Sequence, residues 1–470
     1  MLRKRFWEND HELIPPIRIS DETDRWKRIR YSEEINEDKI SSDNQGEEHP
    51  STNILLCKTQ EKPICMACFD LLYQADTIEC LWPIIEGFNS HNFQVKTFNL
   101  SVSLPSGIII NNHSIKVYVR KKFRERNLSV DLSNILDLKD PFKHLLGWSI
   151  EKELGLKYHY QSPFNISIAY YHEDTQQNHL ILTRHSRQNI IAALEKTPDS
   201  EFISIGNCPP LKVKERWKNH YPILEHAAIY VGGNYIKLSR NISQSPWIIN
   251  GERLAETSVS ECIGEILREK FKCDDYNFVA AGREDSNVRM LGNGRPFYFE
   301  IMNPRRPFLS QQELDEAQRE INETKKDLIQ ISQLTMITEK DLSIIKEGEE
   351  NKKKTYSALV WISKIVTPDI IDKLNQYQDK VFTIQQQTPI RVLQRRAQMV
   401  RSKIIYSMKA EPLENHFLTL QLRTEAGTYI KEFIHGDLGR TKPNLGDLLD
   451  CYADIMALDV LEVDLEWPPK

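Results

Sequence analysis

The half of the chain after His226 constrains the fold most, because strand-like segments follow one another there at short intervals. They are rich in aromatic and β-branched residues and are separated by turn residues, which is typical of strands. The candidates are HAAIYVGGNYIKLSR, which we interpret as two strand-like stretches on either side of a Gly-Gly turn, YNFVA, PFYFEIM, DLIQISQLTMIT, YSALVWISKIV, SKIIYSMKAEPL and HFLTLQLRTEA. Two segments with helical spacing, SVSECIGEILREKF and TPDIIDKLNQYQ, lie between them. We therefore expect a largely antiparallel sheet with helices packed against it.

The preceding part of the chain has a different pattern. Residues 52–225 mix helical spacing, as in NILDLKDPFKHLLGWSIEKEL, with strand-like runs such as FNISIAYYH. The N-terminal stretch carries many charges and few large apolar side chains between Ile17 and Ser51, so it lacks the means to form a core. The predicted organisation is a flexible charged tail at 1–51, an α+β accessory domain at 52–225 and a further domain at 226–470.

Composition excludes several classes of protein. The chain has 62 Lys and Arg against 67 Asp and Glu, a net charge of −5, so any binding of nucleic acid requires a local basic patch. Its apolar runs are too short for a membrane span and its first residues, MLRKRFWENDHEL, lack the apolar core of a signal peptide. Eight cysteines are too few and too scattered for a disulfide scaffold. We expect a protein of the nucleus or cytoplasm, or both, without a membrane partner.

The loop AAGREDSNVRMLGNGRPF, residues 280–297, follows a strand-like run and carries two acids among three arginines. Asp285 is flanked by Arg283 and Arg289, and nearby cations lower the pKa of a carboxyl group. An acid kept ionised in this way can act as a base or a nucleophile. The alternative is that the arginines only hold the loop together.

The segment TPIRVLQRRAQMVRSK, residues 388–403, contains no acid. Uncompensated positive charge is typical of a surface that follows phosphates, although a solvated face is an equal alternative. Interleaved apolar residues predict that one side of the segment is packed. The basic residues are Arg391, Arg395, Arg396, Arg401 and Lys403, and the apolar ones are Val392, Leu393, Met399 and Val400.

The segment LRTEAGTYIKEFIHGDLGRTKPNLGDLL begins at Leu422 and contains a short helical pattern. We predict a helix from Thr428, with its side chain as the cap. Lys431 then lies in the first turn, where the helix dipole disfavours a cation. A partner such as a carboxylate would explain it, and a solvent-exposed lysine is the alternative.

Together these motifs resemble a known family. GREDSNVRMLGNGRPF, KLSRNISQSPWIINGER, TYSALVW, TPIRVLQRRAQMVR and AGTYIKEFIHGDLGRTKP are similar to motifs of the archaeal and eukaryotic tRNA pseudouridine synthases that act on uridines 54 and 55 of the T-arm. CMACFDLLYQ, SPFNISIAYYH, LTRHSRQNIIAALEK and NCPP extend the resemblance to that family's accessory domain, which contains a THUMP-type RNA-binding module.

The resemblance implies an isomerase whose substrate is tRNA and which uses no organic cofactor. The sequence indicates no obligate protein partner. It implies a catalytic domain with a mixed sheet and a central cleft. By residue, it makes Asp285 the catalytic aspartate, Tyr356 the aromatic residue that packs against the target base and takes part in proton removal, and Lys431 the basic partner of the aspartate. The predicted substrate-binding residues are Arg283, Arg289, Tyr429, Arg391, Arg395 and Arg396.

Two features depart from the family pattern. Asn287 stands where the family commonly has a second aspartate. Family members with a structural zinc use two Cys-x-x-Cys pairs, and only Cys65 and Cys68 have that spacing, with Cys57 and Cys80 as substitutes at other separations. The sequence is compatible both with a structural zinc site at these cysteines and with buried free thiols.

Three hypotheses remain from the sequence. The first is an active tRNA uridine isomerase acting at position 54, position 55 or both. The second is a catalytically idle RNA-binding protein on the same scaffold, motivated by Asn287 and the incomplete cysteine pairs. The third is an interaction scaffold that uses the acidic N-terminal tail.

Overall fold

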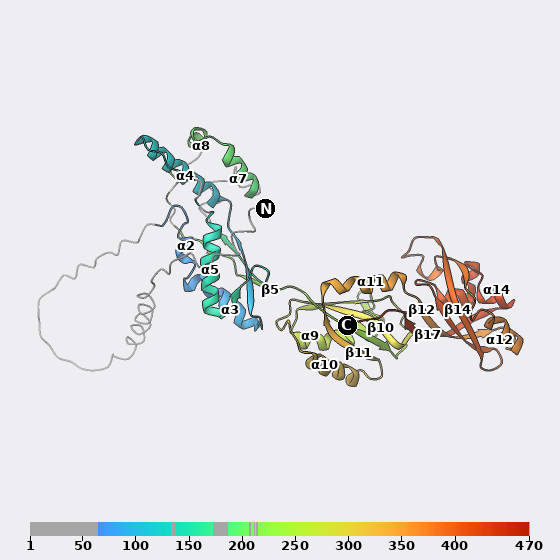
Figure 1. Ribbon diagram of the computed structural model, residues 1–470. Coiled ribbons are helices and arrows are strands. Elements are labelled where there is room, and N and C mark those ends of the chain that lie inside the picture. Colours follow the sequence, from blue (N-terminus) through green and yellow to red (C-terminus); the bar gives the residue numbers. More distant parts are fainter. Residues whose placement is uncertain are drawn as a thin grey trace, which may run out of the picture. The chain divides into compact units, whose positions relative to one another are not determined.

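The computed structural model describes residues 64–132, 135, 137–172, 187–205, 208–210, 212 and 215–469. The predicted tail at 1–51 lies outside these residues. The described part contains two larger sheets with helices packed on them and one two-stranded sheet, so the expected α+β class is confirmed (Figure 1). None of its helices is long and apolar enough to cross a membrane.

The first sheet has five strands in the order β2-β1-β3-β4, with β5 also paired to β3. β1 pairs in parallel with both β2 and β3, whereas β4 and β5 are antiparallel to β3. In β3 every second side chain is buried, which gives the sheet one core-facing side. The strands are β1 Thr97–Ser103, β2 Lys157–Tyr158, β3 Phe164–Tyr171, β4 Lys218–Asn219 and β5 Ile223–His226, and the helices of this region are α2 Leu71–Gln74, α3 Ile78–His91, α4 Gly107–Glu125, α5 Lys139–Leu154, α7 Arg187–Lys196 and α8 Asp199–Ile205.

The second sheet has ten strands in the order β11-β6-β10-β17-β12-β15-β14-β13-β16, with β9 paired to β10. Only the β10–β17 pair is parallel among its described pairings, so the sheet is mixed and largely antiparallel, as expected. Its strands are β6 Ile229–Lys237, β9 Asp275–Ala280, β10 Arg289–Met302, β11 Ile329–Ile337, β12 Lys354–Ile362, β13 Phe382–Gln387, β14 Val400–Pro412, β15 Phe417–Thr424, β16 Thr441–Lys442 and β17 Ala453–Val463.

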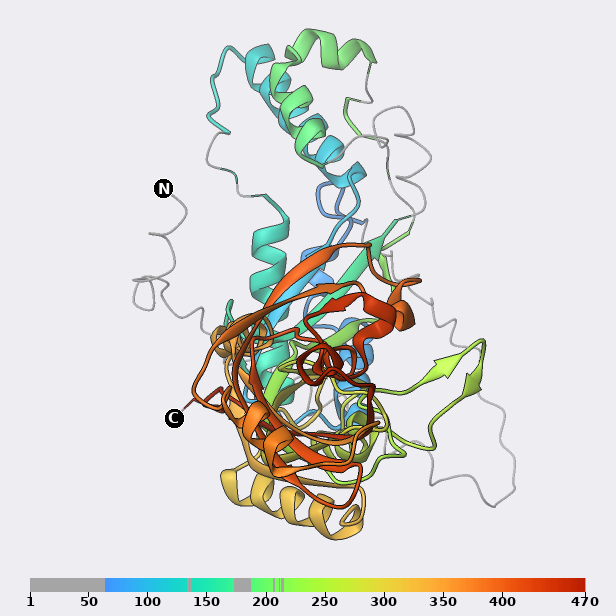
Figure 2. The same cartoon turned by 90° about the vertical axis from the view of Figure 1, so that its right-hand side faces the viewer.

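Helices lie on both sides of the part of this sheet that contains β6, β10 and β11. In Figure 1, α9 (Val259–Phe271) and α10 (Gln311–Thr324) lie on one side and α11 (Leu342–Asn351) lies on the other. A short hairpin, β7 (Ile248–Ile249) with β8 (Glu252–Arg253), extends from the sheet as a separate yellow-green arm in Figure 2. The remaining short helices are α12 Pro368–Asn375, α13 Ile430–His435 and α14 Leu445–Leu449, with single 3₁₀ turns η1 Glu339–Asp341, η2 Ile390–Val392 and η3 Gly436–Gly439.

The Gly-Gly pair at 232–233 is not a turn, so that prediction was wrong. β6 runs through both glycines without a break. A Cβ on Gly232 would lie 2.9 Å from the indole of Trp467, and one on Gly233 would lie 3.1 Å from the ring of Phe297. These glycines give room to neighbouring side chains, a demand that a local sequence pattern does not distinguish from a turn.

β5 ends at His226 and β6 begins at Ile229, and the two sheets have separate apolar cores. The domain boundaries predicted from the sequence remain predictions about independent folding units.

Replacing Gly292 by alanine is expected to destabilise the second sheet strongly. Gly292 has a φ of +61°, and a Cβ there would lie 1.9 Å from the carbonyl oxygen of Leu461 in β17. Gly251, in the hairpin turn, has a φ of +86° with nothing within 4 Å, so Gly251→Ala isolates the cost of backbone strain. We expect Gly292→Ala to lower the free energy of unfolding by about 2 kcal/mol more than Gly251→Ala does, measured by calorimetry. Equal losses in the two variants would contradict the close approach.

Candidate active site

Asp285 lies in the loop between β9 and β10. The two strands are antiparallel neighbours, with Ala280 opposite Phe297. Side chains alternate in direction along the loop: Glu284 is buried, whereas the Asp285 side chain is 45% exposed. The loop therefore presents one carboxylate to solvent and turns the next one into the protein.

The inward-turned Glu284 is held by a buried network. Arg295 donates to it from Nε at 2.8 Å, and both side chains are at most 2% exposed. The Tyr235 hydroxyl donates to Glu284 Oε1 at 2.8 Å, and Gln244 Nε2 donates to that hydroxyl oxygen at 2.7 Å and to the carbonyl of Gly282 at 2.9 Å. These contacts fix the backbone on the N-terminal side of Asp285.

Lys237, at the end of β6, fixes the other side. Its fully buried Nζ donates to the carbonyl oxygens of Ser286 at 2.7 Å, Ile242 at 3.0 Å and Ser239 at 3.2 Å. Burial lowers the pKa of Lys237 to about 8, against the opposing effect of the Glu284 charge. The residue after Asp285 is thus held by an ammonium group that is withdrawn from solvent.

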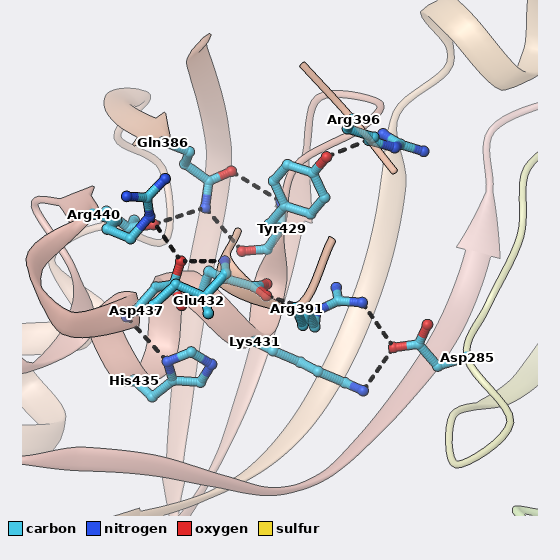
Figure 3. Close-up of polar contacts among 12 residues, drawn as sticks. Asp285, Gln386, Arg391, Arg396, Tyr429, Lys431, Glu432, His435, Asp437 and Arg440 are labelled. Atoms are coloured by element: carbon cyan, nitrogen blue, oxygen red, sulfur yellow. Dashed lines mark hydrogen bonds and ion pairs between the residues drawn. The ribbon is translucent and has the colours of Figure 1, made fainter. Parts of the chain in front are cut away.

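Two cations meet at one oxygen of the Asp285 carboxylate (Figure 3). Lys431 Nζ donates to Oδ2 at 2.8 Å, and Arg391 Nη1 lies 3.4 Å from the same oxygen. Burial raises the pKa of Asp285, but the hydrogen bond from Lys431 and the charges of Lys431, Arg391 and Arg283 together outweigh it, so the net pKa is lowered. The expected ionised carboxylate is supported by this arrangement.

Lys431 has the carboxylate partner that its place at a helix start indicated. It also donates to Asn287 Oδ1 at 3.2 Å, so the asparagine that departs from the family pattern still accepts a hydrogen bond. The expected cap at Thr428 was wrong. The helix begins at Ile430, and the Gln386 side chain accepts from Tyr429 N at 2.9 Å and donates to Tyr429 O at 2.9 Å.

Arg391 reaches the site from η2 and has a second partner. Its Nε donates to Glu432 Oε1 at 2.7 Å, and the Glu432 side chain is only 2% exposed. Arg391 therefore bridges a buried carboxylate and the exposed carboxylate of Asp285 (Figure 3).

Tyr356 lies in β12 and packs against the core of the second sheet. It pairs with Val460 of β17, which in turn pairs with Met290 of β10, so it shares a row of the sheet with the first residues after the loop of Asp285. Burial raises the pKa of Tyr356, and the charge of Arg295 opposes this to a smaller extent, so the phenol stays neutral. In the described residues no hydrogen bond joins it to Asp285.

The other predicted substrate-binding residues fall into two groups. Arg283, Arg395 and Arg396 are exposed, and Arg396 donates to the Tyr429 hydroxyl at 3.0 Å. Arg289 does not contact Asp285, because its guanidinium makes two hydrogen bonds to Asp459, at 2.9 and 2.6 Å. Arg289 is therefore not a direct partner of Asp285, and its role in substrate binding stays a prediction.

The predicted packed side of residues 388–403 was also wrong in part. Val392 and Leu393 are half-buried, but Met399 is 54% exposed and Val400 is 62% exposed. Val400 starts β14, whose first residues continue the exposed segment instead of entering the core.

The described residues do not by themselves supply a four-thiolate zinc site. Cys65 is exposed and Cys68 is buried, and burial raises the pKa of the Cys68 thiol. Cys80 Sγ lies 3.1 Å from the Tyr170 hydroxyl, and Cys57 is outside the described residues. No group of three or more His, Cys, Asp or Glu residues in the described part could hold a metal ion. Zinc at Cys65 and Cys68 stays a prediction.

Sequence reasoning missed the residues that support Asp285. Glu284, Arg295, Gln244 and Glu432 all lie in the quoted motifs, but nothing in the sequence assigned them a role at Asp285. Lys237 offered one signal, since it is the one charged residue in the segment Ile229–Lys237.

Two family models match the chain. The model described as Eukaryotic Pus10, N-terminal, matches residues 65–220. The model described as Pus10, C-terminal, matches residues 230–464.

Relatives with curated names carry the same family name. The human protein named tRNA pseudouridine synthase Pus10 is 35% identical over 460 residues, which covers 94% of this chain and 86% of the human one. The Xenopus laevis protein of that name is 35% identical over 447 residues, covering 92% and 86%. The Methanopyrus kandleri protein of that name is 36% identical over 247 residues, covering 50% of this chain and 56% of the archaeal one.

Likeness to solved structures is weak. A crystal structure of a Cbf5-Nop10-Gar1 complex aligns at 16% identity with a TM-score of 0.27, covering 48% of this chain and 47% of the other. A crystal structure of pseudouridylate synthase aligns at 11% identity with a TM-score of 0.19, covering 63% and 89%. Scores this low carry no structural argument.

The buried network predicts that Glu284→Gln is strongly destabilising. It leaves the buried Arg295 guanidinium without its charged partner, which costs about 3–5 kcal/mol for a buried pair. The matched control is Asp464→Asn, because Arg423 and Asp464 form a pair whose side chains are 47% and 55% exposed, and such pairs contribute about 0–1 kcal/mol. The free energy of unfolding in urea measures both. Similar losses would contradict the supporting role of the network.

Proposed function

The chain belongs to the Pus10 family of tRNA pseudouridine synthases and is an isomerase, and from this premise we propose that it converts uridine to pseudouridine at position 54, position 55 or both in the T-arm of tRNA. The nucleus and the cytoplasm, where tRNA is made and used, are the proposed compartments. The accessory region, including a THUMP-type module, is proposed to bind the same tRNA.

One observation carries the proposal: an exposed carboxylate whose ionised form is stabilised by two cations. Both contacts described for Asp285 go to Oδ2, from Lys431 at 2.8 Å and Arg391 at 3.4 Å. Within the described residues Oδ1 accepts no hydrogen bond. An ionised oxygen without a donor keeps its lone pairs for a substrate, so Oδ1 is the proposed reacting atom.

The reaction breaks the N1–C1′ bond of uridine and forms a C5–C1′ bond, with no net change in composition. In one route Oδ1 attacks C1′ and the N1–C1′ electron pair leaves with the uracil, which turns and attacks C1′ through C5, releasing the carboxylate. In the other route the carboxylate removes a proton from C2′ while the uracil leaves with the N1–C1′ electron pair, which gives a glycal. The turned uracil then bonds to C1′ through C5 as the protonated carboxyl returns the proton to C2′. Both routes end with loss of the C5 proton and protonation of N1, and both require an ionised aspartate.

Lys431 and Tyr356 take the proposed roles of charge partner and aromatic partner. A uridine stacked in the T-arm must leave its stack to meet Asp285, which costs a few kcal/mol. The ring of Tyr356 offers a face for the extruded base. Its neutral phenol is proposed to take part in removing the C5 proton as a relay, which passes its own proton on as it accepts the one from C5.

The exposed arginines are proposed to bind the RNA backbone. Arg283 lies in the same loop as Asp285, and Arg395 and Arg396 lie on the acid-free segment, with the Tyr429 hydroxyl accepting a hydrogen bond from Arg396. Because its guanidinium already donates two hydrogen bonds to Asp459, Arg289 is proposed to fix the start of β10 and to support substrate binding only indirectly.

The idle RNA-binding protein remains the alternative, but its motivation is weaker. Asn287 keeps a contact with Lys431, so the exchange of a carboxylate for an amide does not leave the lysine without its neighbour. Turnover that depends on Asp285 would exclude this alternative.

Asp285→Asn is expected to abolish turnover while leaving tRNA binding intact. An amide cannot act as the anionic nucleophile or base, and loss of such a group lowers rates by about 10²–10⁴-fold or more. Tritium release from C5-tritiated tRNA transcripts measures turnover, and transcripts with a single uridine at position 54 or 55 identify the target. Asp379→Asn, at an exposed aspartate outside the site, is the control. Wild-type protein that binds these transcripts but releases no tritium would overturn the proposed function.

Arg395→Gln with Arg396→Gln is expected to reduce the salt dependence of tRNA binding. Removing one phosphate-binding cation lowers the slope of log K against log salt by about 1. The control is Lys340→Gln with Lys346→Gln, which removes the same charge from exposed positions outside residues 388–403. Filter binding at several salt concentrations gives the slopes. An equal change in the two double variants would contradict a specific phosphate contact.

A further inference from the structure

Glu432 is a buried carboxylate that the reaction as described above does not use. It follows Lys431 in α13, and its side chain is 2% exposed. Oε1 accepts from Arg391 Nε at 2.7 Å, whereas the buried Oε2 has no hydrogen-bond partner in the described residues. Burying a carboxylate is costly unless a partner compensates it, and here the described partner is Arg391 alone.

Arg391 connects Glu432 to Asp285. Its Nε faces Glu432 at 2.7 Å, and its Nη1 faces Asp285 Oδ2 at 3.4 Å. The guanidinium group is a rigid plane, so a bond at Nε also fixes the direction of Nη1. The side chain is 43% exposed and the contact to Asp285 is long, so that contact depends on the shorter bond to Glu432.

The backbone around Arg391 is attached to the same segment that carries Lys431 and Glu432. Asp437 Oδ2 accepts from Ile390 N at 3.2 Å, and Arg440 Nη2 donates to the carbonyl of Thr388 at 2.7 Å. Together with the paired contacts between Gln386 and Tyr429, these bonds align the two segments along their length (Figure 3). The Arg391–Glu432 bond is the one that extends this alignment to Asp285.

We propose that Glu432 is a positioning residue of the isomerase: it orients Arg391 so that Asp285 is held by two cations and not by Lys431 alone. This inference rests on the proposed function, because it assigns Glu432 a role at the same carboxylate. The second cation keeps Asp285 ionised and directs Oδ1 toward the substrate.

An orienting role of Glu432 and a through-space effect of its charge predict opposite changes in the pKa of Asp285 when Glu432 is replaced. If Glu432 orients Arg391, its loss releases Arg391, and the pKa of Asp285 rises toward the ordinary value. If Glu432 acted only as a negative charge near Asp285, its loss would lower the pKa of Asp285. The acidic limb of the kcat profile, where Asp285 becomes protonated, distinguishes the two.

A double-mutant cycle tests the proposal on the full-length protein. We expect Glu432→Gln to lower kcat about tenfold, with little change in tRNA affinity, as for coupled neighbouring residues. The acidic limb of kcat should move to higher pH, toward the ordinary aspartate pKa of about 4, measured between about pH 3 and 6. In the Arg391→Met background, Glu432→Gln should change neither kcat nor that limb. Arg391→Lys keeps the charge but not the two-sided geometry, and should resemble Glu432→Gln.

The control is Glu425→Gln, which breaks the Lys403–Glu425 pair of 2.7 Å in a neighbouring segment without touching Arg391. An equal loss from Glu432→Gln with and without Arg391, or an acidic limb displaced to lower pH, would overturn the inference. If Glu432→Gln does not fold, Arg391→Lys with full wild-type kcat would overturn it instead. Inactive wild-type protein, or an active Asp285→Asn variant, would count against the proposed function itself.

Discussion

The described site depends on one carboxylate oxygen that accepts two positive charges. Asp285 belongs to the β9–β10 loop, whereas Lys431 comes 146 residues later and Arg391 comes 106 residues later. No local segment can bring these groups together, so the ten-stranded sheet must hold the two regions at a fixed separation. The chemistry proposed for Asp285 is therefore a property of the whole sheet.

Buried side chains also fix the backbone on both sides of Asp285. Glu284 and Lys237 are buried charged groups on either side of Asp285, and both are compensated by hydrogen bonds with good geometry. Burying charges adds little net stability, because the desolvation cost is comparable to the gain. These buried groups act by fixing the loop. Because the loop is held at Glu284 and at Ser286, Asp285 has little freedom to turn away from Lys431.

The sequence was most informative where chemistry and local pattern coincide. The strands and the largely antiparallel sheet follow from apolar alternation, and the misplaced charge of Lys431 indicated a carboxylate partner. The sequence did not predict contacts between distant segments. Examples are the pairing of Arg289 with Asp459, the hydrogen bond from Arg391 to Glu432, and the close approach of Trp467 that requires a glycine at position 232. In each case the residue type was visible, but its partner is set by strand order, which a local pattern does not encode.

The place of β17 in the sheet has a consequence for biosynthesis. This strand lies between β10 and β12, so it joins the strands next to Asp285 to those that carry the cationic segments. It is also the last strand of the described chain to emerge from the ribosome. Until residues 453–463 have been translated, no strand can pair with both β10 and β12. The loop of Asp285 and the segments of Arg391 and Lys431 are then not joined by one continuous sheet. We therefore expect the β9–β10 loop and the segments that carry Arg391 and Lys431 to come together only after this strand has been synthesised.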